Sequence, residues 1–401
     1  MPAHFAHDVV VVGGAGHVGL PLAIALADRG ANVQIYDVSA SAVDLVNSGV
    51  MPFLEPGAEP MLRKALAAGM LSATTDAAIV GQARNIVVVI GTPVDGHLNP
   101  DPTAIPTALA ACSSHFRDGQ LLVLRSTVYP GVTALVERMI AGMGVDIPVA
   151  FCPERIAEHR AMTELFSLPQ IVSARTDAGR TRAAELFGLL TDSIVHLEPE
   201  EAELAKLFTN AWRYIKFAAA NQFYMIANDR GLDFERIRQG LTTNYPRARD
   251  LPGAGFAAGP CLFKDTMQLA AFSDNTFSLG HSAMLVNEGL PLYVVSQLEK
   301  RFDLANLTVG ILGMAFKAES DDIRASLSYK LRRVLKFKAK AVLSTDPYVG
   351  EDVDDTLLPL DAVLAKADVL VIATPHAEYR HLHTDKPVAD VWNILGNGVV
   401  V

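Results

Sequence analysis

The chain has 401 residues, half of them hydrophobic, and 44 Asp and Glu residues against 34 Lys and Arg residues give it a net charge of −10. This length predicts two or three domains, and the acidic balance disfavours nucleic acid as a partner. No apolar run is long enough to span a membrane, the first residues lack a signal-peptide pattern, and three scattered cysteines argue against a disulfide framework or a metal site, so we expect a cytoplasmic protein without metal or membrane contact.

The first predicted element is a buried strand over residues 8–12, followed by a glycine-rich turn and a helix. The turn fits the spacing G-x-G-x-x-G, which suits a pyrophosphate, although a tight turn without a ligand also fits it. The next strand ends at Asp37, where a carboxylate would accept a ribose 2′-hydroxyl and repel a 2′-phosphate. The pattern therefore favours NAD over NADP. Its glycines are Gly14, Gly16 and Gly19.

Further strands and helices alternate along the next hundred residues, which predicts a mostly parallel, doubly wound sheet. Ligands of such sheets bind beyond the carboxyl ends of the strands. Polar residues stand at these ends: Thr92, Ser126, Thr127 and Glu154. Each alone is more typical of a cap or a turn, so their repetition is what favours a site.

Residues 199–229 begin with an acidic turn and contain no internal Gly or Pro, which predicts one long helix. Apolar side chains are spread around most of its circumference, so we expect burial on several sides and a homodimer. Lys206 and Asn210 lie one turn apart and are predicted to point together. The simpler interpretation is that Lys206 reaches water and Asn210 bonds a neighbouring helix.

Two more helices are predicted over residues 234–243 and 277–301, with a loop rich in Gly and Pro between them. This loop ends in Cys261, Lys264 and Asp265 at the start of another helix. Its small residues let the backbone approach a ligand, and a neighbouring lysine favours the thiolate form of a cysteine. An isolated cysteine beside a proline is more often inert packing.

A smaller α/β domain is predicted from Leu307 onward, where strands and helices alternate again. The loop after its first strand carries Lys317 and Arg324, which suit phosphate binding as well as they suit a solvated charged loop. We expect an α/β protein with two Rossmann-like, doubly wound domains joined by a long central helix and a helical middle domain. The predicted domains are residues 1–198, 199–303 and 304–401.

The order of the motifs is specific: G-x-G-x-x-G, Asp37, GTP, RST, PE, Lys206 with Asn210, GPCLFKD, FK and DIR. The chain resembles the UDP-glucose/GDP-mannose dehydrogenase family over nearly its whole length, and its UDP-N-acetyl-D-mannosamine branch most. The resemblance implies oxidation of the C6 alcohol of a UDP-sugar to a uronic acid with two NAD, for surface polysaccharide synthesis. It also implies NAD in the first domain, the nucleotide sugar in the third, and the long helix and catalytic loop in the second.

Residue by residue, the resemblance implies that Cys261 is the nucleophile and that Lys206 and Asn210 stabilise negative charge on the C6 oxygen. The other residues implied for catalysis are Asp265 and Thr127, for water, and Glu154, for acid–base work. Those implied for the cofactor are Gly14, Gly16, His17, Val18, Gly19, Asp37, Thr92, Thr127, Glu158, Lys264 and Arg324. Those implied for the substrate are Glu154, Arg155, Lys206, Asn210, Gly255, Gly259 and Lys317.

Some positions depart from the family pattern. His159 stands where a glycine commonly follows the second carboxylate, and Ala257, Ala258 and Pro260 replace part of the glycine-rich run. The alternatives are UDP-glucose 6-dehydrogenase, a two-electron dehydrogenase of the 2-hydroxyacid type, and a sensor of NAD or nucleotide sugars without turnover. The two-electron enzyme has no use for the cysteine or for a third domain, and the combined catalytic set argues against a sensor.

Overall fold

The computed structural model describes residues 4–92 and 101–398, and the chain divides into two compact units, Met1–Phe208 and Thr209–Val401. The boundary between the units lies inside the long helix α8 (Pro199–Asn228). The three domain ranges expected from the sequence stay a prediction. Among the described residues, no helix combines the length and the apolar character needed to cross a membrane.

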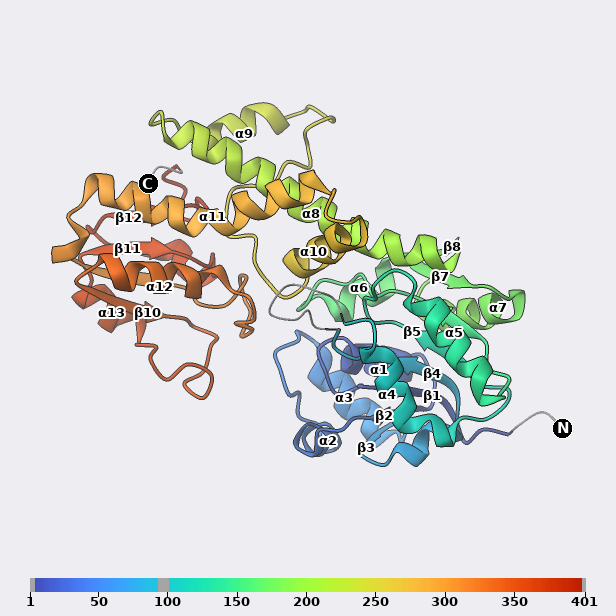
Figure 1. The fold of residues 1–401 in the computed structure, drawn as a ribbon. Coiled ribbons are helices and arrows are strands. Elements are labelled where there is room, and N and C mark those ends of the chain that lie inside the picture. The colour runs from blue at the N-terminus through green and yellow to red at the C-terminus, as the bar shows by residue number, and fades with distance from the viewer. Residues whose placement is uncertain (1–3, 93–100, 399–401) are drawn as a thin grey trace. The chain divides into compact units, whose positions relative to one another are not determined.

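The first unit is built on an eight-stranded sheet with the order β3-β2-β1-β4-β5-β6-β7-β8, drawn from blue to green in Figure 1. Neighbouring strands pair in parallel, except for β6 and β7. The strands are β1 (His7–Val12), β2 (Val33–Tyr36), β3 (Leu71–Thr74), β4 (Ala83–Val88), β5 (Leu121–Leu124), β6 (Val149–Phe151), β7 (Gln170–Ala174) and β8 (Ile194–Leu197). The first six follow the order of a dinucleotide-binding sheet.

Helices cover both faces of this sheet. Along β1, Val9 and Val11 pack into one apolar cluster and Val10 and Val12 into another, which explains why the strand is a continuous apolar run. The helices are α1 (Gly19–Asp28), α2 (Ala40–Asn47), α3 (Ala58–Ala67), α4 (Ala104–Cys112), α5 (Val132–Met143), α6 (Ala161–Ser167) and α7 (Asp177–Gly188), with the 3-10 turns η1 (Ala77–Gln82) and η2 (Ser113–His115). The predicted doubly wound α/β class is confirmed.

The second unit contains a parallel four-stranded sheet with the order β10-β9-β11-β12. Its strands are β9 (Thr308–Leu312), β10 (Ala341–Thr345), β11 (Val369–Ile372) and β12 (Val388–Asp390). Its helices are α9 (Phe234–Thr242), α10 (Leu262–Phe272), α11 (Ser278–Arg301), α12 (Leu327–Lys338) and α13 (Leu360–Lys366), with η3 (Leu304–Asn306) and η4 (Ala377–His381). Figure 1 shows α11 running alongside α12.

The two units repeat one local arrangement. In the first, Asp37 follows β2 and accepts the N–H of Ala15, in the turn after β1, at 3.0 Å. In the second, Asp346 follows β10 and accepts the N–H groups of Met314 at 2.6 Å and Ala315 at 2.9 Å, in the turn after β9. Each strand pair thus places a carboxylate against the turn that follows its first strand.

The turn after β9, in the second unit, is closed to a ligand by side chains of the same unit. The Asp346 side chain is fully buried, and one of its oxygens lies 3.1 Å from Nε2 of His376. Burial opposes the ionisation of Asp346, but its hydrogen bonds to His376 and to backbone N–H groups outweigh burial and lower its pKa. The following helix, α12, begins only at Leu327, so this turn does not lead directly into a helix N-terminus.

Helix α8 is 30 residues long and ends one residue before the end of the predicted range 199–229. Glu203, fully buried in its first turns, accepts the N–H groups of Gly131 at 2.7 Å and Thr133 at 2.8 Å and so caps α5. The prediction that α8 is buried on several sides is wrong for four residues of the single chain. Between 47% and 57% of the surface of each is exposed, and they share one helical face: Phe208, Trp212, Phe223 and Ile226.

Candidate functional site

The three glycines of the motif have different surroundings in the turn after β1. A Cβ on Gly14 would lie 2.7 Å from the carbonyl oxygen of Val11, and one on Gly19 would lie 2.7 Å from Cα of Gly14. A Cβ on Gly16 would meet nothing closer than 3.9 Å. The outer glycines therefore pack the turn against its strand and helix, whereas the middle one leaves a side open to a ligand, as a pyrophosphate requires.

Asp37 is oriented beside this turn by two backbone groups. One oxygen accepts the N–H of Ala15 and the other accepts the N–H of Ser39, both at 3.0 Å. Each carboxylate oxygen keeps a further lone pair. The structure therefore holds a negatively charged acceptor at the end of β2, where the motif predicts a contact to ribose.

His17, in the same turn, meets a residue of the loop between β6 and α6. Its Nδ1 lies 2.9 Å from a carboxylate oxygen of Glu158, and its ring stacks on Phe53 at 4.0 Å between centroids. Val18 precedes α1 at its N-cap position. Two residues that are distant in the sequence, both predicted to contact the cofactor, are thus brought together.

The carboxyl ends of β4 and β5 also meet. The Thr92 hydroxyl donates to the carbonyl oxygen of Thr127 at 2.7 Å, and the Ser126 hydroxyl accepts the N–H of Ile90 at 2.8 Å. The polar strand ends therefore form one edge of the sheet, as the parallel pattern predicts.

Glu154 is buried and held by several donors. It forms an ion pair with the fully buried Arg125, and its other oxygen accepts the N–H groups of Arg155 at 2.7 Å and Ile156 at 2.9 Å. Arg155 donates to the carbonyl oxygen of Pro169, and burial lowers the pKa of its guanidinium. These bonds fix the start of the loop that carries Glu158. Sequence reasoning assigned no role to Arg125, although it begins the RST motif.

His159 has a positive φ of 64°, in the left-handed region that a glycine adopts without strain. A glycine would adopt this backbone conformation at lower cost than a histidine. We expect His159→Val to lower the melting temperature by a few degrees, because a β-branched residue in this region costs about 1–3 kcal/mol. His159→Gly should melt within about 2 °C of the parent, since relief of strain offsets the greater entropy of the unfolded chain. Equal melting temperatures of the two variants in calorimetry would contradict the claim that the backbone at residue 159 is strained.

Lys206 is only 9% exposed. A buried cation of this kind is expensive unless an anion meets it. It lies on α8, one turn before Asn210.

In the second unit, the predicted catalytic residues gather at the start of α10. Cys261 occupies the N-cap position of this helix and is exposed. Asp265, 1% exposed, accepts a hydrogen bond from the side-chain amide of Asn210 at 2.6 Å, and its own N–H donates to the carbonyl oxygen of Cys261 at 2.9 Å. The ammonium of Lys264 lies 3.4 Å from the other Asp265 oxygen.

The loop before Cys261 is shaped by two glycines with positive φ, at 153° for Gly255 and 103° for Gly259. A Cβ on Gly255 would lie 2.2 Å from the ring of Trp392, and one on Gly259 would lie 2.7 Å from the ring of Phe316. Both positions therefore require glycine for internal packing. Any contact that they make to a substrate would use their backbone groups.

Lys317 and Arg324 lie between β9 and α12 and have different neighbours. The guanidinium of Arg324 bonds the carboxylate of Asp322 through two nitrogens at 2.6 to 3.0 Å. The ammonium of Lys317 lies 5.5 Å from the centre of the Phe316 ring. The same ring covers Gly259, so Lys317 is near the loop that precedes Cys261.

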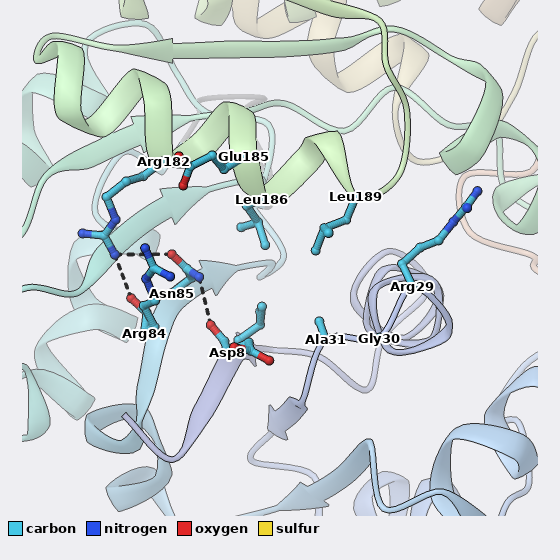
Figure 2. A pocket seen from close by; sticks show the side chains of 11 residues that line it. Asp8, Arg29, Gly30, Ala31, Arg84, Asn85, Arg182, Glu185, Leu186 and Leu189 are labelled. Carbon is cyan, nitrogen blue, oxygen red and sulfur yellow. Dashed lines mark hydrogen bonds between the residues drawn. The ribbon is translucent and has the colours of Figure 1, made fainter. Parts of the chain in front are cut away.

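A hollow of about 240 Å³ lies at the amino ends of β1 and β4, shown in Figure 2. Arg182 of α7 donates to the carbonyl oxygen of Arg84 at 3.2 Å, and Asn85 donates to that of Asp8 at 2.9 Å. None of the predicted site residues lines this hollow. In a parallel sheet it is at the edge opposite the glycine turn, so it is not the expected cofactor site.

The prediction from the sequence did not include Gly13 among the residues of the cofactor turn. Its φ is 73°, and a Cβ there would lie 2.3 Å from the carbonyl oxygen of Val89, so only glycine fits. The doubled glycine at residues 13 and 14 was the available signal.

Among the described residues, no group of three or more His, Cys, Asp and Glu side chains could hold a metal ion.

Comparison with known proteins gives matches over most of the chain. Models of the UDP-glucose/GDP-mannose dehydrogenase family match residues 8–190 as its NAD binding domain, 200–289 as its central domain and 310–397 as its UDP binding domain. The UDP-N-acetyl-D-mannosamine dehydrogenase of Pyrococcus horikoshii is 30% identical over 387 residues, 93% of this chain and 91% of that protein. That of Escherichia coli (strain K12) is 28% identical, over 93% of this chain and 94% of that protein.

Two solved structures are similar over nearly their whole length. The UDP-D-ManNAc dehydrogenase of Pyrococcus horikoshii superposes with a TM-score of 0.90 at 28% identity, covering 98% of this chain and 97% of that chain. A UDP-glucose dehydrogenase from Pyrobaculum islandicum also gives a TM-score of 0.90, at 29% identity, covering 97% of this chain and 95% of that chain.

Proposed function

Because this chain belongs to the UDP-glucose/GDP-mannose dehydrogenase family, whose members are NAD-dependent dehydrogenases of nucleotide sugars, we propose that it oxidises UDP-N-acetyl-D-mannosamine to the corresponding uronic acid. The bacterial and archaeal relatives with this named activity support the choice of sugar. The product would serve surface polysaccharide synthesis. The observation that supports the chemistry best is the cluster of Cys261, Asn210, Lys264 and Asp265 at the start of α10.

In the proposed reaction, NAD bound in the first domain would supply the hydride acceptor for each of two oxidations at C6. The Cys261 thiolate adds to the aldehyde formed by the first step, and the oxygen takes up a proton to give a thiohemiacetal. Loss of the second hydride and of that proton gives a thioester. Water then releases the carboxylate and returns the thiol.

The position of Cys261 suits a nucleophile. Cys261 stands at the N-terminus of α10, and the N-terminus of a helix favours a thiolate over a thiol. The other two cysteines are buried, and burial raises the pKa of Cys112 to about 11 and that of Cys152 to about 12. Only Cys261 therefore combines exposure with surroundings that stabilise its reactive form.

Asn210 and Lys206 would stabilise the developing negative charge on the C6 oxygen. One N–H of the Asn210 amide is taken by Asp265, which orients the group and leaves the second N–H for the oxygen. Asp265 and Thr127 would position the hydrolytic water, and Glu154 would serve proton transfer near the sugar. We propose that the cofactor and the nucleotide sugar are bound by the residues predicted from the sequence. The proposed domains are residues 1–198, 199–303 and 304–401.

A panel of nucleotide sugars tests the proposed substrate. We expect kcat/KM to be highest for UDP-N-acetyl-D-mannosamine and lower for UDP-glucose and GDP-mannose. UDP-glucose is the second candidate, because a UDP-glucose dehydrogenase gives an equally high TM-score. Activity confined to UDP-glucose would overturn the proposed substrate and leave the reaction type intact.

We further propose a homodimer that covers the exposed face of α8. Burial of one large apolar side chain contributes about 1.5–3 kcal/mol, so the four exposed residues of this face favour association. We expect sedimentation equilibrium to report twice the chain mass for the parent and a single chain for Trp212→Glu. Phe337→Glu is the matched control, because Phe337 is 84% exposed but lies on α12. A parent protein that sediments only as a single chain would contradict the dimer.

A further inference from the structure

A buried carboxylate outside the predicted site connects the cofactor turn to the loop after β6. Glu55 lies between α2 and α3 and is 5% exposed. One of its oxygens accepts the N–H of His159 and the other accepts the N–H of Ala161, both at 2.9 Å. Ala161 is the first residue of α6, whose N-cap residue provides no side-chain hydrogen bond. Glu55 therefore caps this helix from a distant part of the chain.

The same short segment reaches the glycine turn. Phe53, two residues before Glu55, stacks on the ring of His17, which in turn lies 2.9 Å from Glu158. We refer to residues 53–55 as the bridging segment. It touches the turn through Phe53 and the loop through Glu55, so one contact ends on His17 itself and the other on His159, next to Glu158.

The two contacts differ in what they require. The ring of Phe53 supplies apolar packing, which many side chains could provide. The carboxylate of Glu55 accepts two backbone N–H groups at once, and one of them belongs to His159, whose φ is 64°. Burial raises the pKa of Glu55, while the N–H groups of Ala161 and His159 act against this shift. A glutamine would fill the same volume without that cost, but it has one acceptor oxygen in place of two.

We propose that Glu55 is a positioning residue, which holds the loop at residues 157–161 so that Glu158 meets His17 beside the cofactor turn, and which thereby sets the affinity for NAD. Glu55 itself need not touch the cofactor. The proposal uses the NAD-binding character of the first unit and does not depend on which sugar is oxidised.

The test compares Glu55→Gln with the parent in the full-length protein. NADH binding is measured by fluorescence titration without sugar, and UDP binding by calorimetry. We expect the Kd for NADH to rise about tenfold, because one acceptor is replaced by a donor facing an N–H group. The Kd for UDP should stay within about twofold, because the UDP binding domain matches residues 310–397 and Glu55 lies outside it. Glu55→Asp, which keeps both acceptors on a shorter side chain, should recover part of the NADH affinity.

Glu59→Gln is the matched control. It makes the same chemical change four residues later, on the exposed face of α3, where Glu59 pairs with Arg63 at 2.5 Å. The control should bind NADH as the parent does. Equal NADH affinity for Glu55→Gln and Glu59→Gln would overturn the proposal, and so would a Glu55→Gln variant that lost NADH and UDP binding in the same proportion. Because these titrations need no turnover, they stand even if the panel of sugars shows no activity.

Discussion

Replacing Cys261 with alanine is expected to abolish formation of the uronic acid, with a loss in rate of about a thousandfold or more. The reason is that the aldehyde must become tetrahedral before it can give up a second hydride, and the thiol provides the adduct. The parent should release two NADH for each carboxylate formed, with no accumulation of free aldehyde. Stoichiometry of NADH and carboxylate, measured by absorbance and mass spectrometry, checks this result.

Cys261→Ser tests the same hypothesis with a side chain of similar size. Its ester hydrolyses more slowly than a thioester, so the variant should stall with the sugar attached, and the intact protein should gain the mass of the acyl group. Cys112→Ala is the control, since Cys112 is buried on α4 and should not affect stoichiometry. An alanine variant at Cys261 that still produced two NADH per sugar near the parent rate would end the nucleophile hypothesis.

The second large effect is expected in the choice of cofactor. We expect kcat/KM for NAD to exceed that for NADP by about 10²–10³, because the 2′-phosphate of NADP would meet the Asp37 carboxylate at close range with like charge. The two N–H groups that hold Asp37 prevent it from turning away. Initial rates with the two cofactors under identical conditions measure the ratio.

Asp37→Ser should lower the ratio of kcat/KM for NAD to kcat/KM for NADP, because it changes both values. The variant loses the acceptor for the ribose hydroxyls, which lowers kcat/KM for NAD, and it loses the repulsion, which raises kcat/KM for NADP. Asp44→Asn removes the same charge from an exposed position on α2 and should leave the ratio unchanged. Parent rates that are equal for NAD and NADP would show that Asp37 does not select the cofactor.

The parts of the fold that could be predicted from the sequence are those set by short-range patterns. The glycine turn, Asp37 after the second strand and the long helix α8 all follow from spacing within about thirty residues. The meeting of strand ends at one edge follows from parallel topology and needs no knowledge of individual contacts.

Contacts between distant residues were beyond such reasoning. Asn210 and Asp265 are 55 positions apart, and Glu55 and Ala161 are 106 apart, so no local pattern pairs them. The resemblance implied separate catalytic roles for Asn210 and Asp265 but not their contact, and the role of Glu55 had no signal at all. The exposure of Trp212 was also unpredictable, because an apolar helical face looks the same whether its cover comes from the same chain or from another molecule.

The closed turn of the second unit bears on the timing of the proposed four-electron reaction. Asp346 already occupies the N–H groups of Met314 and Ala315, and α12 does not begin at that turn, whereas the turn after β1 leads directly into α1 and leaves Gly16 open to a ligand. In the proposed reaction, two molecules of NAD would visit the turn after β1 in succession. The first NADH would have to depart while the half-oxidised sugar stays bound, so we expect complete oxidation to depend on the residence time of the aldehyde.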